Sequence, residues 1–326
     1  MSDALHVLAP GLLTTVQDRG RTGWRHLGVP LAGALDPMAM ELANRLVGNR
    51  VDAALLELSL QGPRLQLLRP LRIALSGAPV EARFDGVVLP GQRPIELPAG
   101  VLDLGGMRAG ARAWLAIAGG IDVPPVLGSR STDLRGGFGG LHGRALQRGD
   151  RLALVEPPAL DCAQPRIARW WVEPDEAAPA RAGDPPVIRY RPGAHPRSLD
   201  LSAHAWQIGT ASNRQGVRLQ GRSLPGDAAS GVSAPVAPGT IQLPADGQPI
   251  VLLADAQTVG GYARLGHVIA TDLPRLAQCR PGQAFRFVAC DAGTAHGSAC
   301  GLRARMARMA LMIEMMIERD RNRAAA

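Results

Sequence analysis

The amino-acid sequence predicts a mainly β protein with few helices, organised as two barrel-like subdomains and a C-terminal helix. Short apolar runs recur between Gly, Pro and Asp at intervals of about 8–12 residues, which is typical of antiparallel barrels and sandwiches. The 326 residues include 39 glycines and 27 prolines, so frequent turns are expected. Aromatic residues make up only 3%, and the core must therefore rest on Leu, Val, Ile and Ala.

One helix is predicted in the first subdomain, residues 1–155, and its ends are signalled locally. Asp36 precedes Pro37. Aspartate is a good N-cap because its carboxylate accepts unpaired backbone N–H groups, and proline is pre-set for the first helical position. Gly48 can end the helix in a left-handed conformation. These signals predict a helix over 37–48.

Predicted strands make up the rest of this subdomain. Loose alternation over 5–17 indicates one or two short strands, and further strands are expected at 54–60 and 64–69. A β-rich module follows over 71–118. Glu57 lies inside the apolar run ALLELSL, where a carboxylate either faces solvent on an edge strand or is paired in a site. We favour the edge strand.

A stretch rich in Pro, Ala and acidic residues at 156–186 is interpreted as a linker. The second subdomain is expected over 187–295, with a buried strand at 249–255. Residues 296–326 predict an amphipathic helix and tail with a methionine-rich stripe. Methionine adapts to partner surfaces, so the stripe is expected either to bind a partner or to pack on its own subdomain. Its members are Met306, Met309, Met312, Ile313, Met316 and Ile317.

The composition excludes several classes of function. All 36 basic residues are arginine, and without lysine the chain can hold neither a Walker A phosphate site, a pyridoxal-phosphate Schiff base nor biotin. The net charge of +8 does not indicate nucleic-acid binding, because the arginines are scattered and no basic run is interleaved with aromatics. The cysteines form no CxxC and the histidines no HExxH, so no metal site is expected. With no signal peptide and no apolar run of ~18 residues, we expect a cytoplasmic protein that does not bind membranes.

Polar residues crowd two loops that are broken by glycine. Gln17 and Asp18 lie in the first loop, where they either fix the turn or hold a polar substrate or partner. Arg130 lies in the second loop, between two hydroxyl residues and ahead of the cluster GGFGG at 136–140. Arginine can bind a carboxylate through two parallel hydrogen bonds, and glycine clusters let backbone N–H groups approach an anion. The alternative is a loop whose glycines only permit tight turns.

Several motifs resemble, in the same order, the allophanate hydrolase subunit 2 family. They are TTVQDRGRTGWRHLGVP, GALDPMAMELANRLVGN, AWLAIAGGIDVPPVLGSRSTDLRGGFGG, RALQRGDRL and PGTIQLPADGQPIVLLADAQTVGGY. The similarity covers roughly residues 5–290. This family includes the C subunit of bacterial 5-oxoprolinase, the antagonist of the Kip kinase inhibitor and a segment of the carboxyltransferase region of urea carboxylase.

The resemblance implies a cyclophilin-like β-barrel in the second subdomain and a hetero-oligomeric complex that uses ATP to hydrolyse 5-oxo-L-proline to L-glutamate. A different chain of the complex would bind the ATP, and this chain would bind no cofactor. The implied partners are an allophanate hydrolase subunit 1-like protein (the 5-oxoprolinase B subunit) and a lactam-utilisation-family protein (the A subunit). Two alternatives stay open: the carboxyltransferase component of a biotin-dependent urea or amide carboxylase, and a non-catalytic regulator that binds a Kip-inhibitor-like partner.

The resemblance also implies roles for individual residues. Asp255 is the candidate acid/base or cation partner, and Asp18 is the second candidate catalytic residue. The expected substrate-binding residues are Arg130, Arg214, Gln17, Asn213 and Gln257.

Three positions depart from the family pattern. Asn213 stands where the pattern has aspartate, which removes a charge and keeps hydrogen bonding. Ala32 replaces a usual serine, and Ala256 replaces a usual arginine beside Asp255. These losses keep the regulatory alternative open.

Overall fold

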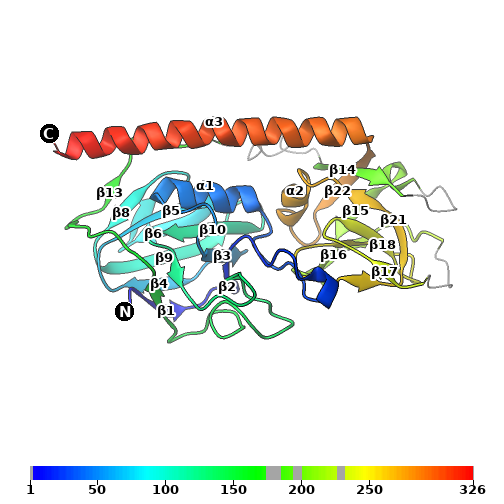
Figure 1. Ribbon diagram of the computed structural model, residues 1–326, viewed down its shortest axis with the longest axis horizontal. Helices are drawn as coiled ribbons and strands as arrows, with labels where there is room; N and C mark the ends of the chain where they lie inside the picture. Colours follow the sequence, from blue (N-terminus) through cyan, green and yellow to red (C-terminus); the bar gives the residue numbers. More distant parts are fainter. Residues whose placement is uncertain (1–2, 174–184, 194–199, 226–231, 326) are drawn as a thin grey trace. The chain divides into compact units, whose positions relative to one another are not determined.

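The chain divides into two compact units, and most of their elements are labelled in Figure 1. The first unit comprises Met1–Gly20, Asp36–Ala177 and Ala304–Ala326, and the second comprises Arg21–Leu35 and Ala178–Arg303. This computed structural model describes residues 3–173, 185–193, 200–225 and 232–325. The described residues form three α-helices and are otherwise mainly β, which confirms the predicted fold class.

The second unit contains a closed barrel, as predicted for the C-terminal half. Its seven strands follow the order β14-β21-β18-β19-β16-β15-β22, and only β14 and β22 pair in parallel. Aromatic rings pack inside it, with the centroids of Tyr190 and Phe287 5.3 Å apart. The barrel strands are β14 (Val187–Pro192), β15 (Ala205–Ile208), β16 (Gly216–Gln220), β18 (Thr240–Leu243), β19 (Ile250–Leu252), β21 (Ala263–Val268) and β22 (Ala284–Ala289). The remaining elements of this region are the short ribbon of β17 (Ala234–Pro235) and β20 (Val259–Gly260), the 3-10 turn η3 (Leu201–Ala203) and helix α2 (Leu273–Ala277).

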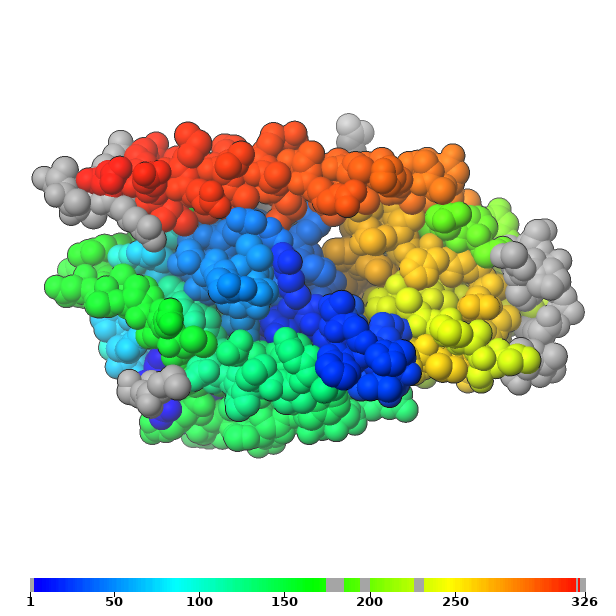
Figure 2. Space-filling model, viewed as in Figure 1, coloured from blue at the N-terminus to red at the C-terminus, as the bar shows by residue number. Residues whose placement is uncertain are grey.

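The segment Arg21–Leu35 joins the barrel although it precedes helix α1 in the chain. It contains a 3-10 turn, η1 (Arg25–Leu27), and is drawn in dark blue in Figure 2, against the barrel. Ala32 N donates a hydrogen bond of 2.9 Å to Ala254 O, and Arg25 Nη2 donates to Val236 O. These bonds link the segment to residues more than 200 positions later in the sequence.

The first unit is built from two antiparallel sheets. One has the strand order β11-β12-β1-β4-β9-β6-β7 and the other the order β13-β8-β5-β10-β3-β2. The strand rhythm allows a barrel or a sandwich, and this unit has two open sheets, as in a sandwich. Its strands are β1 (Leu5–Ala9), β2 (Leu13–Gln17), β3 (Leu55–Ser59), β4 (Arg64–Leu67), β5 (Leu71–Gly77), β6 (Val80–Phe84), β7 (Val87–Leu89), β8 (Ile95–Leu97), β9 (Gly100–Met107), β10 (Arg112–Ile117), β11 (Ile121–Asp122), β12 (Arg151–Leu154) and β13 (Arg166–Ile167).

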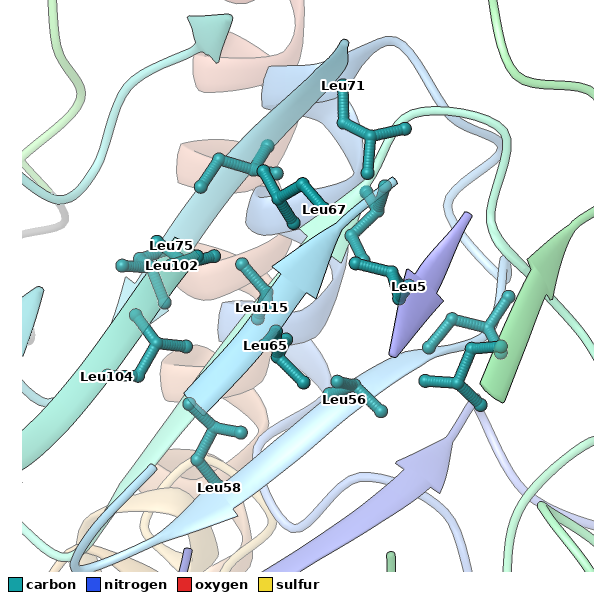
Figure 3. Packing of buried hydrophobic residues seen from close by; sticks show 14 of the residues in the cluster. Leu5, Leu56, Leu58, Leu65, Leu67, Leu71, Leu75, Leu102, Leu104 and Leu115 are labelled. Carbon is teal, nitrogen blue, oxygen red and sulfur yellow. The ribbon is translucent and has the colours of Figure 1, made fainter. Parts of the chain in front are cut away.

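Apolar side chains from both sheets form one core (Figure 3). Leu5, Leu65 and Leu102 come from the first sheet, and Leu56 and Leu115 from the second; all are 0% exposed. Burying one such side chain contributes about 1.5–3 kcal/mol. Leucine therefore carries this core, as the low aromatic content predicts.

Glu57 corrects one expectation. It lies on β3, between β10 and β2, and is only 1% exposed. Its Oε2 accepts a hydrogen bond of 3.1 Å from Trp114 Nε1, and Arg112 Nη1 lies 3.9 Å from its Oε1. The edge-strand interpretation is therefore wrong, because cross-strand partners compensate a carboxylate in an inner strand.

Helix α1 (Pro37–Val47) packs against β5 and β10 and has the predicted ends. Asp36 Oδ1 accepts hydrogen bonds from the N–H groups of Met38 and Ala39 at 3.1 and 3.0 Å. Gly48 follows the helix with φ 80°, the left-handed conformation that glycine adopts without strain. Local capping alone thus accounts for both boundaries.

The predicted C-terminal helix is present as α3 (Ala292–Ala325). Trp170 from the interpreted linker is buried and donates a hydrogen bond of 2.7 Å to Asp320 on this helix. Within the same stretch, β13 pairs with β8, while residues 174–184 lie outside the described residues. None of the helices in the described ranges has the length and apolar character needed to cross a bilayer.

Candidate functional site

A carboxylate at the end of β2 holds the serine-flanked loop of the first unit. Asp18 Oδ1 accepts hydrogen bonds from Ser129 Oγ at 2.5 Å and Ser131 Oγ at 2.6 Å. Asp18 Oδ2 accepts from the backbone N–H of Arg130 at 2.5 Å. Both carboxylate oxygens are therefore engaged, and Asp18 is only 8% exposed. We call this arrangement the Asp18 clamp.

Gln17 supports the same loop from the last position of β2. Its Nε2 donates to Thr15 Oγ1 at 3.0 Å and to Thr132 O at 3.3 Å. The side chain is completely buried, and its Oε1 has no hydrogen-bond partner among the described residues. Gln17 and Asp18 thus fix consecutive parts of the loop onto one strand end.

Arg130 is held by its backbone and by one side-chain nitrogen. Its Nε donates a hydrogen bond of 2.9 Å to Val123 O, and its carbonyl accepts one of 3.1 Å from Gly140 N. In the described part of the chain, neither of its Nη groups donates a hydrogen bond. The guanidinium is therefore oriented by the protein while two of its nitrogens stay available to a ligand.

Next to Arg130 lies a hollow of about 480 Å³. Val123 and Gly140, which both bond to Arg130, belong to its lining, whereas Arg130 itself does not. The walls are mostly apolar, and Asp122 and His142 are the titratable side chains among them. The full lining is Asp122, Val123, Pro124, Val126, Gly137, Phe138, Gly139, Gly140, Leu141, His142 and Gly143.

Two glycines of the loop are required by close approach. A Cβ at Gly140, where φ is 52°, would lie 1.9 Å from Thr132 Oγ1. A Cβ at Gly143, where φ is 69°, would lie 2.1 Å from Gly137 O. Both positions combine a left-handed backbone with contacts that no other residue permits. The glycine cluster therefore serves the fold of the loop itself, in agreement with the tight-turn alternative.

The same loop also offers hydrogen-bond donors. In the part of the chain that the structure describes, the backbone N–H groups of Gly139, Leu141 and His142 donate no hydrogen bond. All three residues line the hollow. Adjacent N–H groups without acceptors favour anions, so the loop can combine tight turns with anion binding.

An ion pair fixes the chain directly after the hollow. Arg144 donates to both carboxylate oxygens of Asp150, at 2.7 and 2.8 Å. Hydrogen bonding from Arg144 holds the pKa of the Asp150 carboxyl below its usual range. The backbone N–H of Gln147 adds a third donor at 2.7 Å. This pair closes the turn of the RALQRGDRL motif.

In the second unit, Arg214 and Asp255 form a buried bidentate ion pair. Arg214 Nε and Nη2 lie 2.9 Å from the two Asp255 carboxylate oxygens, and both side chains are 3% exposed. Arg214 Nη2 also donates to Gly33 O at 2.6 Å, which attaches the segment Arg21–Leu35 to the barrel. The guanidinium and the carboxylate that were predicted to contact substrate thus engage one another.

Asn213 and Gln257 have local roles in the same unit. Asn213 Oδ1 accepts a hydrogen bond of 2.8 Å from Gln215 N and closes its own turn, which an amide oxygen does as well as a carboxylate. Gln257 Nε2 lies 3.4 Å from Gln242 Oε1. The departure at 213 therefore preserves the turn.

The predicted site residues fall into separate groups. Gln17, Asp18 and Arg130 meet in the first unit, whereas Arg214 and Asp255 meet in the second. Sequence reasoning missed the Val123 carbonyl that anchors Arg130, because nothing in an apolar run marks one carbonyl as an acceptor. No group of three His, Cys, Asp or Glu side chains in the described ranges is placed to hold a metal ion.

Comparison with known proteins places these features in a family. The family model for the carboxyltransferase domain, subdomain A and B, matches residues 27–289. The 5-oxoprolinase C subunit of Escherichia coli (strain K12) is 41% identical over 298 residues, which cover 88% of this chain and 91% of that protein. The urea amidolyase of Lachancea kluyveri is 34% identical over 307 residues, covering 87% of this chain and only 17% of that much longer protein.

A solved structure agrees with this assignment. The crystal structure of the Kluyveromyces lactis urea carboxylase aligns with a TM-score of 0.83 at 32% identity, covering 96% of this chain and 29% of that chain. The sequence motifs, the two sheets and barrel, and these matches all agree. The chain therefore belongs to the family of carboxyltransferase domains with subdomains A and B.

Proposed function

We propose that this chain is a subunit of an ATP-dependent complex that hydrolyses 5-oxo-L-proline to L-glutamate. The observation that carries the proposal is the 41% identity to the 5-oxoprolinase C subunit of E. coli, which extends over 91% of that protein. The companion proteins are an allophanate hydrolase subunit 1-like protein and a lactam-utilisation-family protein. One of them binds the ATP, and this chain binds no cofactor of its own.

The reaction needs an activated carbonyl. A lactam carbonyl is a poor electrophile, and phosphorylation of its oxygen by ATP would make it susceptible to water. Fixed donors must then stabilise the charge that develops on oxygen. The remaining carboxylate of the substrate needs a cation to hold it in a single orientation.

Arg130 and the hollow lined by its two hydrogen-bond partners, Val123 and Gly140, together offer donors of both kinds. The two Nη groups of Arg130 suit a carboxylate, and the N–H groups of Gly139, Leu141 and His142 suit an oxyanion. The apolar walls fit the methylene carbons of a five-membered ring. In this proposal Arg130 binds the substrate carboxylate, and Asp18 positions Arg130 through its backbone.

The test is reconstitution with the two companion proteins and an assay of glutamate released from 5-oxo-L-proline. Release should require ATP and this chain. Arg130→Lys keeps the charge and loses the two-nitrogen geometry, so KM should rise about tenfold or more, on the scale of one charged hydrogen bond. Arg135→Ala, an exposed arginine of the same loop, is the matched control and should leave KM unchanged. Unchanged kinetics in Arg130→Ala would remove Arg130 from the site.

A second candidate is a biotin-dependent carboxyltransferase component. The similarity to the urea carboxylase structure favours it, with its TM-score of 0.83. A biotinylated carrier protein would then be needed, since the chain contains no lysine to carry biotin. The test of this candidate is an assay of urea carboxylation with and without this chain and a biotin carrier. If carboxylation requires both, and 5-oxo-L-proline yields no glutamate, the second candidate replaces the first.

A further inference from the structure

Two titratable side chains line the hollow of the first unit without a partner of their own. Asp122 is half-buried and His142 is exposed, and neither side chain forms a hydrogen bond or an ion pair with any residue that the structure describes. The neighbouring carboxylates are engaged, Asp18 in its clamp and Asp150 by Arg144. Asp122 and His142 are therefore the lining side chains that can exchange a proton with a ligand.

The backbone at His142 is in a conformation that is uncommon for a residue with a Cβ. Its φ is 56°, in the left-handed region that glycine adopts without strain. The turn around it is closed by a hydrogen bond of 2.8 Å from Gly143 N to Gly139 O. Strained residues cluster at functional sites, so a histidine at this position of the wall indicates a role for its imidazole.

The charged neighbours of His142 come from its own loop and from the strand before it. Asp122 ends β11 and lines the same hollow. The lowered pKa of the Asp150 carboxyl comes first from the hydrogen bond of Arg144, and the charge of His142 adds to it. Arg130 is hydrogen-bonded to two lining residues. Histidines change charge near neutral pH, whereas aspartates are ordinarily ionised there, so histidine is the better proton donor of the two lining types.

The proposed reaction needs a proton donor at one step. After phosphorylation of the lactam oxygen and addition of water, the reacting carbon carries two leaving groups, phosphate and the ring nitrogen. Expulsion of phosphate regenerates the lactam and consumes ATP without product. Opening of the ring requires the C–N bond to break, and the nitrogen departs readily only if it gains a proton in the same step.

We propose that His142 donates this proton to the ring nitrogen. The electron pair of the C–N bond goes to the nitrogen, which leaves as an amine, and the hydroxyl of the added water loses its proton to solvent as a carbonyl forms. Water then hydrolyses the resulting acyl phosphate to L-glutamate and phosphate, and the imidazole regains its proton from solvent. This inference rests on the proposed function, because it assigns a residue to that reaction.

The test follows phosphate and glutamate together in the reconstituted complex. His142→Gly removes the imidazole at a position whose φ suits glycine, so the fold should be kept, and thermal unfolding checks this. Glutamate release should fall about 100-fold or more, on the scale of a lost general acid, with KM for 5-oxo-L-proline little changed. Phosphate release that depends on 5-oxo-L-proline should continue, so the ratio of phosphate to glutamate rises.

Added imidazole distinguishes proton donation from a structural role. It can enter the space vacated in His142→Gly and should restore part of the glutamate release, which it would not do for a variant that is merely misfolded. His296→Gln changes an exposed histidine on α3 and is the matched control, with both products expected unchanged. Asp122→Asn tests the other lining group, and the ratio of phosphate to glutamate should not rise in this variant.

Chemical labelling tests the location of His142 without turnover. Diethyl pyrocarbonate modifies exposed imidazoles, and peptide mass spectrometry measures the extent at each histidine. In the intact complex without ATP, 5-oxo-L-proline should slow the labelling of His142 and leave that of His296 unchanged. Equal labelling of His142 with and without saturating 5-oxo-L-proline would overturn the inference.

The kinetic outcomes separate this inference from the proposed function. If the unmodified complex releases glutamate and His142→Gly keeps the same ratio of phosphate to glutamate, or imidazole restores nothing, His142 is not the donor and the proposed function stands. If Asp122→Asn raises the ratio instead, the donor is Asp122. If the unmodified complex releases no glutamate, the proposed function fails and this inference fails with it.

Discussion

The Arg214–Asp255 pair allows the sharpest prediction about this molecule. Both side chains are 3% exposed, and two hydrogen bonds of 2.9 Å join them. Asp255→Asn keeps the size of the side chain but removes its charge and one acceptor. The buried Arg214 guanidinium would then lose the carboxylate that pairs with it through two hydrogen bonds.

The expected cost follows from these contacts. Removing one partner of a buried ion pair destabilises by about 3–5 kcal/mol, because the remaining charge stays desolvated. The double variant Arg214→Met, Asp255→Leu removes both charges and should recover most of this loss. It still leaves Gly33 O without the hydrogen bond of 2.6 Å from Arg214, so a deficit of about 1–3 kcal/mol should persist.

Urea unfolding followed by far-UV circular dichroism measures these differences, and hydrogen exchange of residues 31–35 reports the detachment of the segment. If Asp255→Asn unfolds within about 1 kcal/mol of the unmodified chain, the energetic reasoning is refuted. The double variant also tests chemistry. If Asp255 acts as an acid or base, the folded double variant is inactive in the reconstituted complex. Retained activity would instead assign the pair to structure alone.

Three further predictions concern other parts of the fold. Arg144 lowers the pKa of Asp150, so the pair stabilises the protein at neutral pH, and this contribution is lost as the pH falls through the folded-state pKa of Asp150. Asp150→Asn should therefore lower the free energy of unfolding by about 0.5–1 kcal/mol at pH 7, after allowance for solvent screening, and should leave it unchanged in strong acid. Urea titrations at several pH values measure this difference. Burial raises the pKa of Cys279 to about 12. Iodoacetamide at pH 8 should therefore alkylate the exposed Cys300 and leave Cys279 unmodified until the protein unfolds. Peptide mass spectrometry measures the labelling, and early labelling of Cys279 would contradict the prediction. Gly140→Ala should lower the free energy of unfolding by about 1–3 kcal/mol more than Gly137→Ala does, because only the Cβ added at position 140 would contact a neighbour, Thr132 Oγ1 at 1.9 Å. Thermal unfolding measures the difference, and equal melting temperatures of the two variants would contradict this packing.

The features that the sequence predicted best depend on neighbours a few residues apart. The helix over 37–48 is signalled by Asp36 and Gly48, and both act within one turn of α1. Short apolar runs separated by turn residues likewise indicate the short strands of the second half, whereas the closure of these strands into a barrel was implied by the family resemblance. Such signals are local, so they survive without knowledge of the tertiary structure.

The features that the sequence did not predict depend on partners far along the chain. Glu57 contacts Trp114 and Arg112 on β10, of which Trp114 is 57 positions away, and no local pattern marks that pairing. The segment Arg21–Leu35 joins the barrel through Ala254 and Arg214, more than 180 residues later. Periodicity reports which face of an element is apolar, but it cannot report which distant strand supplies a hydrogen bond.

In the candidate site, the sequence identified the residues but did not identify their hydrogen-bond partners. The polar loop containing Asp18 and the loop containing Arg130 were both identified from the sequence, and the structure brings them together. The structure also shows which of their polar atoms are already engaged in hydrogen bonds. A carboxylate whose two oxygens already accept from Ser129, Ser131 and Arg130 is poorly placed to take a proton from substrate, because each donor would have to be displaced first. The free donors are instead the two Nη groups of Arg130, whose geometry suits the binding and orientation of an anion.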